Sequence, residues 1–434
     1  MAETKAAPRD TAVASGAQRL AVLGWLTGSL FFFYAWVLRV APSVIVDDLM
    51  REFAVGAAAI GNLSAFYFYG YAGLQIPIGM IIDRFGPRRP IALAALATAL
   101  GCVIFAFGTS LWTLAAGRFL IGAAAAFSLV GAMAVAGQWF PPRRFALLSG
   151  IAMMLGMAGG VFGQAPLRLL VERTDWRSVM LMTAIGGVVL SLLAVATIRD
   201  RQRGSGGFGQ VLGGLGRVVA NRQTWLISFA GLGSTGPLLG FAGLWGVPYL
   251  TATQGFTRTE AASLTSLLFI GWGIGAPLIG WLSDRLGRRR IPFAAGMALC
   301  TASLATLVYA PDLSTTATAV LCFLCGFGGS SQIVGFAAAR EHNVARLSGT
   351  AIGFVNGMVT GAGALYQPLL GALLDLGWTG QIVAGARIYD IAAYRAAFTV
   401  LVVGAAVGTL CALAMRETWC KPVATETDNP TVIG

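Results

Sequence analysis

Residues 79–89 read Gly79-Met-Ile-Ile-Asp83-Arg84-Phe-Gly86-Pro87-Arg88-Arg89, and residues 280–290 repeat the pattern as Gly280-Trp-Leu-Ser-Asp284-Arg285-Leu-Gly287-Arg288-Arg289-Arg290. Each copy is a short charged stretch between two long apolar runs. Upstream, Gly70 and Gly271 stand at the same offset as Asp83 and Asp284. A second pair, Ser149-Gly150 and Ser348-Gly349, opens a glycine-rich run in each half. We therefore predict an internal duplication.

The composition points to a membrane protein. Of 434 residues, 56% are hydrophobic and 11% charged, against about 25% charged in soluble domains. The mean hydropathy is +0.74. Because a membrane-spanning helix needs about 20 apolar residues, the chain is long enough for a dozen spans. We place them at 20–46, 57–82, 90–108, 111–138, 145–171, 178–198, 223–252, 259–283, 291–309, 314–339, 348–375 and 389–415.

The charges predict the organisation of the chain. An Arg- and Gly-rich stretch divides the spans six and six, and 21 of the 30 basic residues fall on the side of the N-terminus. By the positive-inside rule we expect both termini to be cytoplasmic. We expect the membrane to be the inner membrane of a bacterium. The predicted parts are a tail (1–18), a six-helix bundle (19–198), a cytoplasmic linker (199–222), a second six-helix bundle (223–415) and a C-terminal tail (416–434).

The repeated pattern Gly-x-x-x-Asp-Arg-x-Gly-x-Arg-Arg resembles the signature of the major facilitator superfamily. It stands between the second and third spans and again between the eighth and ninth, and the resemblance covers the whole chain. Pro87 departs from it, because the signature usually has a basic residue there. The resemblance implies an all-α integral membrane fold of twelve transmembrane helices in two pseudo-symmetric six-helix bundles. It also implies transport by alternating access around a cavity between the bundles.

The repeated motif is a candidate conformational latch. Its glycines allow close approach to a neighbouring helix, and its acids can meet the positive N-terminal ends of the spans that begin near Ser348 and Ser149. Such contacts would hold the outward-open state. The alternative is that the motif only enforces topology and loop shape. The latch residues are Gly79, Asp83, Arg84, Gly86, Arg88, Arg89, Gly280, Asp284, Arg285, Gly287, Arg288 and Arg289.

Two arginines lie within predicted spans, where a charge costs at least ~2.5 kcal/mol and is a functional candidate by default. The Arg39-Val-Ala-Pro42-Ser43 stretch is similar to the organophosphate and anion:cation symporter branches of the superfamily, which implies that Arg39 binds a phosphate or carboxylate. Alternatively, Arg39 reaches the outer interface or pairs with Asp47 or Asp48. Organophosphate carriers of the superfamily usually pair this arginine with a second one in the seventh span, but residues 223–252 hold no charge. The resemblance therefore favours a carboxylate or zwitterion over a dianionic phosphate.

Arg118 and Gly122 resemble a fourth-span motif of the superfamily, whose arginine usually binds carbonyls of the first span in a structural or gating role. Direct contact with the substrate is the alternative, so Arg118 is also a candidate substrate-binding residue. Further polar and aromatic side chains are candidates for a substrate-binding cavity, although each could equally form an interhelical hydrogen bond worth ~0.6 kcal/mol. These candidates are Tyr34, Trp36, Trp245, Gln332, Gln164, Gln367 and Asn356.

The sequence favours a secondary transporter of a small organic anion or zwitterion, such as a carboxylate or amino acid. Proton-driven efflux of amphiphilic compounds and a transporter-like ligand sensor are the alternatives. No motif indicates an enzyme, a cofactor, a metal site or a nucleic-acid partner. We expect a monomer in the lipid bilayer, with symport or antiport of a coupling proton or ion left open. His342 is expected to be a solvated loop residue rather than a proton relay.

Overall fold

The computed structural model describes residues 9–200, 215–344 and 347–423, and within these ranges the protein is built almost entirely of helices. Its strands there, β1 (Ile382–Val383) and β2 (Ala386–Arg387), pair antiparallel as one small hairpin. Most of the predicted linker 199–222 lies outside the described residues, and residues 215–220 of it are helical.

The first half of the chain forms the first bundle. Its elements are α1 (Arg9–Val40), η1 (Ala41–Val44), α2 (Val46–Phe53), α3 (Ala57–Phe85), α4 (Arg88–Phe107), α5 (Leu111–Ala125), α6 (Phe127–Trp139), α7 (Pro142–Phe162), α8 (Ala165–Arg173) and α9 (Trp176–Thr197). The helix α1 begins inside the predicted N-terminal tail (1–18), whereas the candidate membrane span begins at Gln18. The small residues between Arg9 and Gln18 include several alanines, the best helix formers.

The second half repeats the first. Its elements are α11 (Arg222–Gly236), η2 (Pro237–Trp245), α12 (Gly246–Gln254), α13 (Arg258–Leu286), α14 (Arg290–Tyr309), α15 (Thr315–Gly329), α16 (Gln332–Glu341), α17 (Ser348–Leu376) and α18 (Ile391–Ala414). Within the described ranges, eleven helices are long and apolar enough to cross a membrane, and a bent pair of Val46–Phe53 and Ala57–Gln75 adds a twelfth candidate. The twelve-helix membrane fold is therefore confirmed.

The duplication predicted from the motif is visible in helix packing. Glycines bring α3 onto α5 in the first half and α13 onto α15 in the second, and a Cβ at any of them would collide with a backbone carbonyl of the facing helix. Gly70 faces the backbone carbonyl of Phe119, and Gly271 faces that of Phe323 at the matching place in the second half. In the same way, Gly122 faces the carbonyl of Tyr67 and Gly326 that of Leu268. Helices approach this closely in lipid because small residues let their backbones meet.

The first and seventh spans are interrupted at related places. A 3₁₀ turn, η1, follows α1 and contains Pro42, which has no backbone N–H to donate. A π-helix, η2, begins at Pro237 in the seventh span. The two interruptions contact each other between the halves. Irregular backbone at membrane depth is tolerated where it is buried in protein, as it is here.

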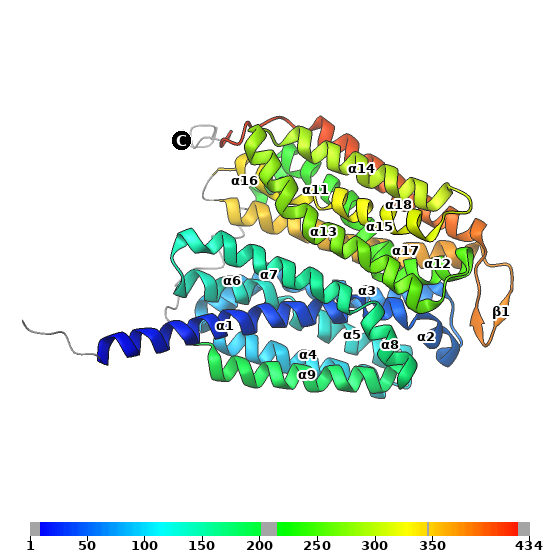
Figure 1. The fold of residues 1–434 in the computed structure, drawn as a ribbon, viewed down its shortest axis with the longest axis horizontal. Coiled ribbons are helices and arrows are strands. Elements are labelled where there is room, and N and C mark those ends of the chain that lie inside the picture. The colour runs from blue at the N-terminus through cyan, green and yellow to red at the C-terminus, as the bar shows by residue number, and fades with distance from the viewer. Residues whose placement is uncertain (1–8, 201–214, 345–346, 424–434) are drawn as a thin grey trace, which may run out of the picture.

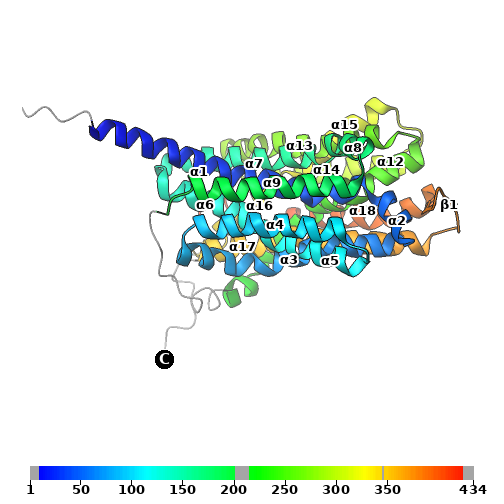
Figure 2. The same cartoon turned by 90° about the horizontal axis from the view of Figure 1, so that it is seen from below.

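Figure 1 shows the two halves as two layers of helices, with α1 to α9 in one and α11 to α18 in the other. The described start of α1 and the described end of α18 lie at one end of the molecule, and β1 lies at the opposite end; the turned view in Figure 2 shows the same polarity. We call the end where α1 begins and α18 ends the terminal face, and the end with the β-hairpin the hairpin face.

Candidate functional site

Arg39 lies in an aromatic box at the end of α1. Its guanidinium carbon is 4.1 Å from the ring centroid of Trp36, 4.7 Å from that of Tyr71 and 5.4 Å from that of Tyr67, and Nε donates to the Tyr67 hydroxyl at 3.3 Å. The side chain is 6% exposed. Nη2 is buried and has no hydrogen-bond partner among the described residues. The box therefore leaves one donor of a buried cation unsatisfied.

Arg118 holds the end of the first span. Its Nη1 donates to the carbonyl of Leu38 at 2.7 Å, and Nη2 donates to those of Arg39 and Ser64 at 3.4 Å. Because α1 ends at Val40, its last carbonyls have no partner within the helix, and Arg118 satisfies two of them. The predicted binding of first-span carbonyls is confirmed. Arg118 thus positions the backbone that carries Arg39.

The two buried arginines have no acidic partner. Neither forms an ion pair with any described residue, and the alternative that Arg39 pairs with Asp47 or Asp48 is wrong. Those acids bind Arg258 and Arg168 instead, at 2.8 Å for Asp47 to Arg258 and 3.1 Å for Asp48 to Arg168. Two uncompensated cations in a water-poor interior favour an incoming anion.

The second half offers polar groups but no charge at the matching depth. Gln332, at the junction of α15 and α16, is buried, and both of its amide atoms lack partners among the described residues. Trp245 and Gln367 are already engaged with each other, since Trp245 Nε1 donates to the Gln367 carbonyl at 3.0 Å. The Gln367 amide donates to Leu239 in η2 at 2.8 Å. Of the three, Gln332 has the most free hydrogen-bonding capacity.

Gln164 joins the two halves. It lies between α7 and α8, and its Nε2 donates to the carbonyl of Ala242 in η2 at 2.6 Å. Its Oε1 accepts from Ser43 in η1 and from Thr265 in α13, both at 3.2 Å. The side chain therefore spans the contact between the two interrupted spans, which is a structural use of a residue predicted to bind substrate.

Two other predicted site residues lie apart from the aromatic box. Tyr34 donates its hydroxyl to the Thr183 carbonyl of α9 at 2.8 Å, so it faces the interior of the first bundle. Asn356 in α17 donates to Gln75 in α3 at 3.4 Å and thus bridges the halves nearer the terminal face. Neither side chain is in contact with Arg39.

Sequence reasoning missed one aromatic member of the site. Phe269 of α13 reaches across from the second half, with its ring centroid 6.1 Å from that of Trp36. A lone phenylalanine in an apolar span carries no signal of this role. Tyr67 and Tyr71, in contrast, are one helical turn apart and stack at 6.0 Å between ring centroids, whereas Tyr69 between them is 43% exposed.

The halves are locked together at the hairpin face. Asp375, at the end of α17, accepts from the backbone N–H groups of Ala57 and Ala58 at 3.0 and 2.9 Å, so a carboxylate of the second half caps α3 of the first. Tyr389 donates its hydroxyl to the same carboxylate at 2.6 Å. We call Asp375 with its partners, together with the Arg258 pairs to Asp47 and Asp48, the hairpin-face lock.

The halves stand apart at the terminal face. A Cβ built on Gly79, Gly150, Gly349 or Gly353 would meet no atom within 4 Å. A cavity of about 480 Å³ with apolar walls also separates α7 from α13 there. The close helix approach predicted at Gly79 and Gly280 is not made in this conformation, since a Cβ on Gly79 would meet no atom within 4 Å and one on Gly280 would meet only the side chain of Ile333.

The second copy of the repeated motif is engaged within its own half. Arg289 Nη1 bonds to Asp284 at 2.6 Å, and Nη2 bonds to buried Glu341 at 2.8 Å. The Asp284 side chain is 70% exposed and bonds to no described residue of the first half. Burial lowers the pKa of Arg289, but the hydrogen bonds to Glu341 and Asp284 outweigh burial and hold it above its ordinary value. The side chain of Asp83 lies outside the described part of the chain.

His342 differs from its expected solvated state. It is 6% exposed, and Nε2 lies 3.1 Å from the carbonyl oxygen of Arg416. Burial lowers the pKa of His342 below its ordinary value and so favours the neutral imidazole. Because α16 ends one residue earlier and packs against α11 and α17, the loop start is covered. His342 lies at the terminal face, away from the aromatic box.

Comparison with known proteins places the chain among transporters. A family model described as Major Facilitator Superfamily matches residues 25–246 and 236–432. A gentisate transporter of Corynebacterium glutamicum is 27% identical over 405 residues, which is 89% of this chain and 88% of that protein. The membrane sensor protein UhpC of Escherichia coli is 24% identical over 389 residues, 83% of this chain and 86% of that protein.

Among solved structures, a bacterial homologue of the human lysosomal transporter Spinster is similar, with a TM-score of 0.74 and 18% sequence identity. The match covers 91% of this chain and 98% of that chain. At this identity the likeness shows a shared fold.

Proposed function

Because the chain belongs to the major facilitator superfamily and is a secondary transporter of a small molecule, we propose that its substrate is an organic anion or zwitterion whose carboxylate binds Arg39. The observation that carries the proposal is the unpaired, buried Nη2 of Arg39 beside a second buried arginine, with no acid to neutralise either. A guanidinium binds carboxylates through paired N–H groups, and the bond is stronger where water is excluded.

The surroundings of Arg39 support a substrate with an aromatic or planar body. Trp36 and Tyr71 each present a ring to the guanidinium, and Phe269 closes on Trp36 from the other half. The relative from Corynebacterium glutamicum transports gentisate, which is an aromatic carboxylate. Gln332, with its unsatisfied amide, is a second polar anchor that the other half contributes.

We propose that the terminal face is cytoplasmic in a bacterial inner membrane, which the excess of basic residues there supports. The described conformation is then open toward the cytoplasm and locked toward the outside. Substrate exchange requires the hairpin-face lock to open and the terminal face to close. On the closed terminal face, Asp284 would meet the start of a span in the first half, as the latch resemblance implies.

Replacing Arg39 tests the proposal. Lys retains the charge but loses the paired N–H groups, so R39K should raise the KM for uptake of radiolabelled gentisate into proteoliposomes about tenfold or more. Y34F is the matched control in the same helix, because the Tyr34 hydroxyl bonds within the first bundle, and its KM should stay within about twofold of the wild type. Unchanged gentisate uptake by R39K would exclude this role for Arg39.

The same proteoliposomes define the transport mode. Uptake is measured with a proton gradient, with a sodium gradient and with unlabelled substrate inside, which distinguishes symport from exchange. A panel of carboxylates, amino acids and amphiphilic amines shows whether anions are preferred over cations. If every anion and zwitterion is excluded while amphiphilic amines are expelled, the efflux alternative replaces the proposal.

A ligand sensor is the second candidate, and the similarity to the sensor UhpC favours it. A sensor would bind ligand, seen as a rise in the thermal unfolding temperature, without accumulating or exchanging it. Binding that depends on Arg39 together with no flux under any gradient would support the sensor. Flux would exclude a sensor that does not transport.

A further inference from the structure

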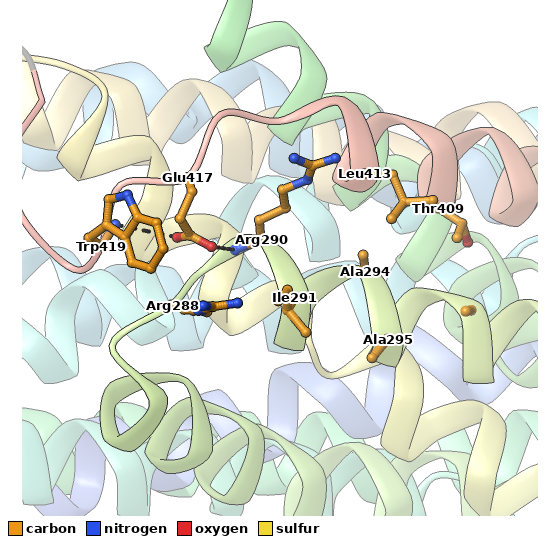
Figure 3. Close-up of a pocket in the computed structure, with 10 residues that line it drawn as sticks. Arg288, Arg290, Ile291, Ala294, Ala295, Thr409, Leu413, Glu417 and Trp419 are labelled. Atoms are coloured by element: carbon orange, nitrogen blue, oxygen red, sulfur yellow. Dashed lines mark hydrogen bonds between the residues drawn. The ribbon is translucent and has the colours of Figure 1, made fainter.

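A groove opens between α14 and α18 where both helices reach the terminal face. It has a volume of about 550 Å³. Figure 3 shows arginines, an acid and a tryptophan gathered at one end, with short apolar side chains and Thr409 toward the other. Its lining residues are Arg288, Arg290, Ile291, Ala294, Ala295, Ala298, Thr409, Leu413, Glu417 and Trp419.

The apolar end of the groove follows one helix face. Ile291, Ala295 and Ala298 are exposed and recur at helical spacing on α14, over about 10 Å of helix. The alanines leave the space that a larger side chain would fill. At the end of the groove away from Trp419, the hydroxyls of Thr301 and Thr409 lie 3.0 Å apart and join the two helices. The groove therefore suits a hydrocarbon chain lying along the helices.

The polar end carries positive charge that the protein leaves unneutralised. Among the described residues, the guanidiniums of Arg288 and Arg290 form no ion pair. Arg288 lies over the ring of Trp419, with its guanidinium carbon 5.0 Å from the ring centroid. Trp419 is 57% exposed and sits where the helices end, which is the usual depth of tryptophan at a membrane interface.

Among the described residues that line the groove, Glu417 is the one acid, and it is already bound. Glu417 accepts from the backbone N–H groups of Arg289 at 2.7 Å and Arg290 at 3.1 Å, and so caps the N-terminus of α14. It also accepts from the N–H of Thr418 at 3.1 Å. Its carboxylate is thereby directed to the backbone, and the two guanidiniums remain available to an external anion.

The first half shares the cap but lacks the paired charge. There Asp200 accepts from the N–H of Arg88 at 3.0 Å and so caps α4, as Glu417 caps α14. The position that matches Arg288 is Pro87, and the Arg88 side chain is bound to the carbonyl of Val195 at 3.0 Å. The junction of α4 and α9 therefore lacks the two adjacent free arginine side chains that lie beside α14 and α18.

We propose that the groove between α14 and α18 binds an anionic phospholipid, with its phosphate on Arg288 and Arg290 and an acyl chain along Ile291, Ala295 and Ala298. Charge selects an anionic headgroup over a zwitterionic one, and the apolar walls select a lipid over a free phosphate. The site is separate from Arg39 and does not depend on the identity of the transported substrate.

Native mass spectrometry of the detergent-purified full chain tests the site. Phosphatidylglycerol and phosphatidylcholine with the same acyl chains are added in equal amounts. We expect the wild type to retain phosphatidylglycerol at least about fivefold more than phosphatidylcholine, and R288Q/R290Q to lose that preference. The matched control, R84Q/R89Q, removes two exposed arginines from the same face of the first half and should keep the preference.

A second variant separates a groove from a charged surface. A295W fills the apolar wall and leaves both arginines in place, so it should also abolish selective retention, while glycerol phosphate should not displace lipid from the wild type. Lipid retention unchanged by A295W or by R288Q/R290Q, or a wild type that does not discriminate, would overturn the proposal. If the arginine variant does not fold, the A295W result and the wild-type preference still decide it.

Discussion

At the hairpin face the two halves are joined by charged groups that cross between them, whereas the described charged groups at the terminal face pair within their own half. Asp375 caps a helix of the opposite half through Ala57 and Ala58, while Asp284 turns to Arg289 in its own half. Both acids lie at the end of a span. The difference teaches that a carboxylate on a helix N-terminus joins the halves at the hairpin face, whereas the matching contact proposed for Asp284 is not made in this conformation.

The packing between the faces agrees with that division. Toward the hairpin face, a Cβ at Gly61 or Gly371 would collide with a carbonyl of the other half. Toward the terminal face, Gly79 and Gly353 have open space around them. The halves are therefore hinged about the hairpin side in this conformation. Since a two-state equilibrium responds to the difference in contacts, removing contacts from one face should favour opening of that face.

The largest effect is expected from D375N. Asn keeps the shape and one oxygen acceptor but loses the charge, and hydrogen bonds to charged groups are worth about 1.5–3 kcal/mol each. A loss of about 3 kcal/mol corresponds to about a hundredfold shift toward opening at the hairpin face. Pulsed electron paramagnetic resonance between spin labels at Thr109 and Thr316, exposed on opposite halves, should show a new, longer distance.

D390N is the matched control for D375N, because Asp390 accepts from the N–H of Ala393 within the second half at 2.8 Å. Its distance distribution should equal that of the wild type. If D375N leaves the distribution unchanged while the protein remains folded, Asp375 does not hold the hairpin face shut.

The second prediction concerns the terminal face. In the described conformation Asp284 is exposed and makes no contact across the halves, so D284N alone should change the distances little. In the D375N background the molecule spends more time closed at the terminal face, where Asp284 is proposed to act. Adding D284N should then move the conformational equilibrium back by about tenfold. This is the change expected when one charge-assisted contact is lost.

Labels at Arg89 and Arg340, exposed on opposite halves of the terminal face, report this reversal directly. They should approach each other in D375N and separate again in the double variant. R285Q is the control, since its charge lies next to Asp284 while the Asp284 carboxylate is retained. An additive response, in which D284N has the same small effect in both backgrounds, would contradict a latch at Asp284.

The comparison of faces also shows what the sequence could predict. The spans and the duplication follow from hydrophobicity and repeated motifs, which are local properties of the chain. The buried Arg39 was likewise evident, because few charges occur in such apolar runs. These features need no knowledge of which helices meet.

The hairpin-face lock could not be predicted in the same way. Asp375 and Ala57 are 318 positions apart, and an aspartate at the end of a span is an ordinary interfacial residue until its partner is known. The π-helix at Pro237 and the reach of Phe269 to Trp36 likewise depend on contacts between distant segments. The motif identified the face at which charges gather, but the state of each face depends on how the two halves pack.

The smallest effect is expected from Y389F. The Tyr389 hydroxyl donates to Asp375 and accepts from the N–H of Ala57 at 2.9 Å, so its removal weakens the lock by about 1 kcal/mol, roughly fivefold in the equilibrium.

Burial, followed by the hydrogen bond to Asp375, raises the pKa of Tyr389 above its ordinary value. A raised pKa favours the neutral hydroxyl in the lock, so its contribution is present at neutral pH and is lost only as pH rises through the folded-state pKa. The difference in the Thr109 to Thr316 distances between wild type and Y389F should therefore be the same at pH 7 and pH 9.5. A difference that vanishes by pH 9.5 would mean that the hydroxyl ionises early and that the lock does not shield it.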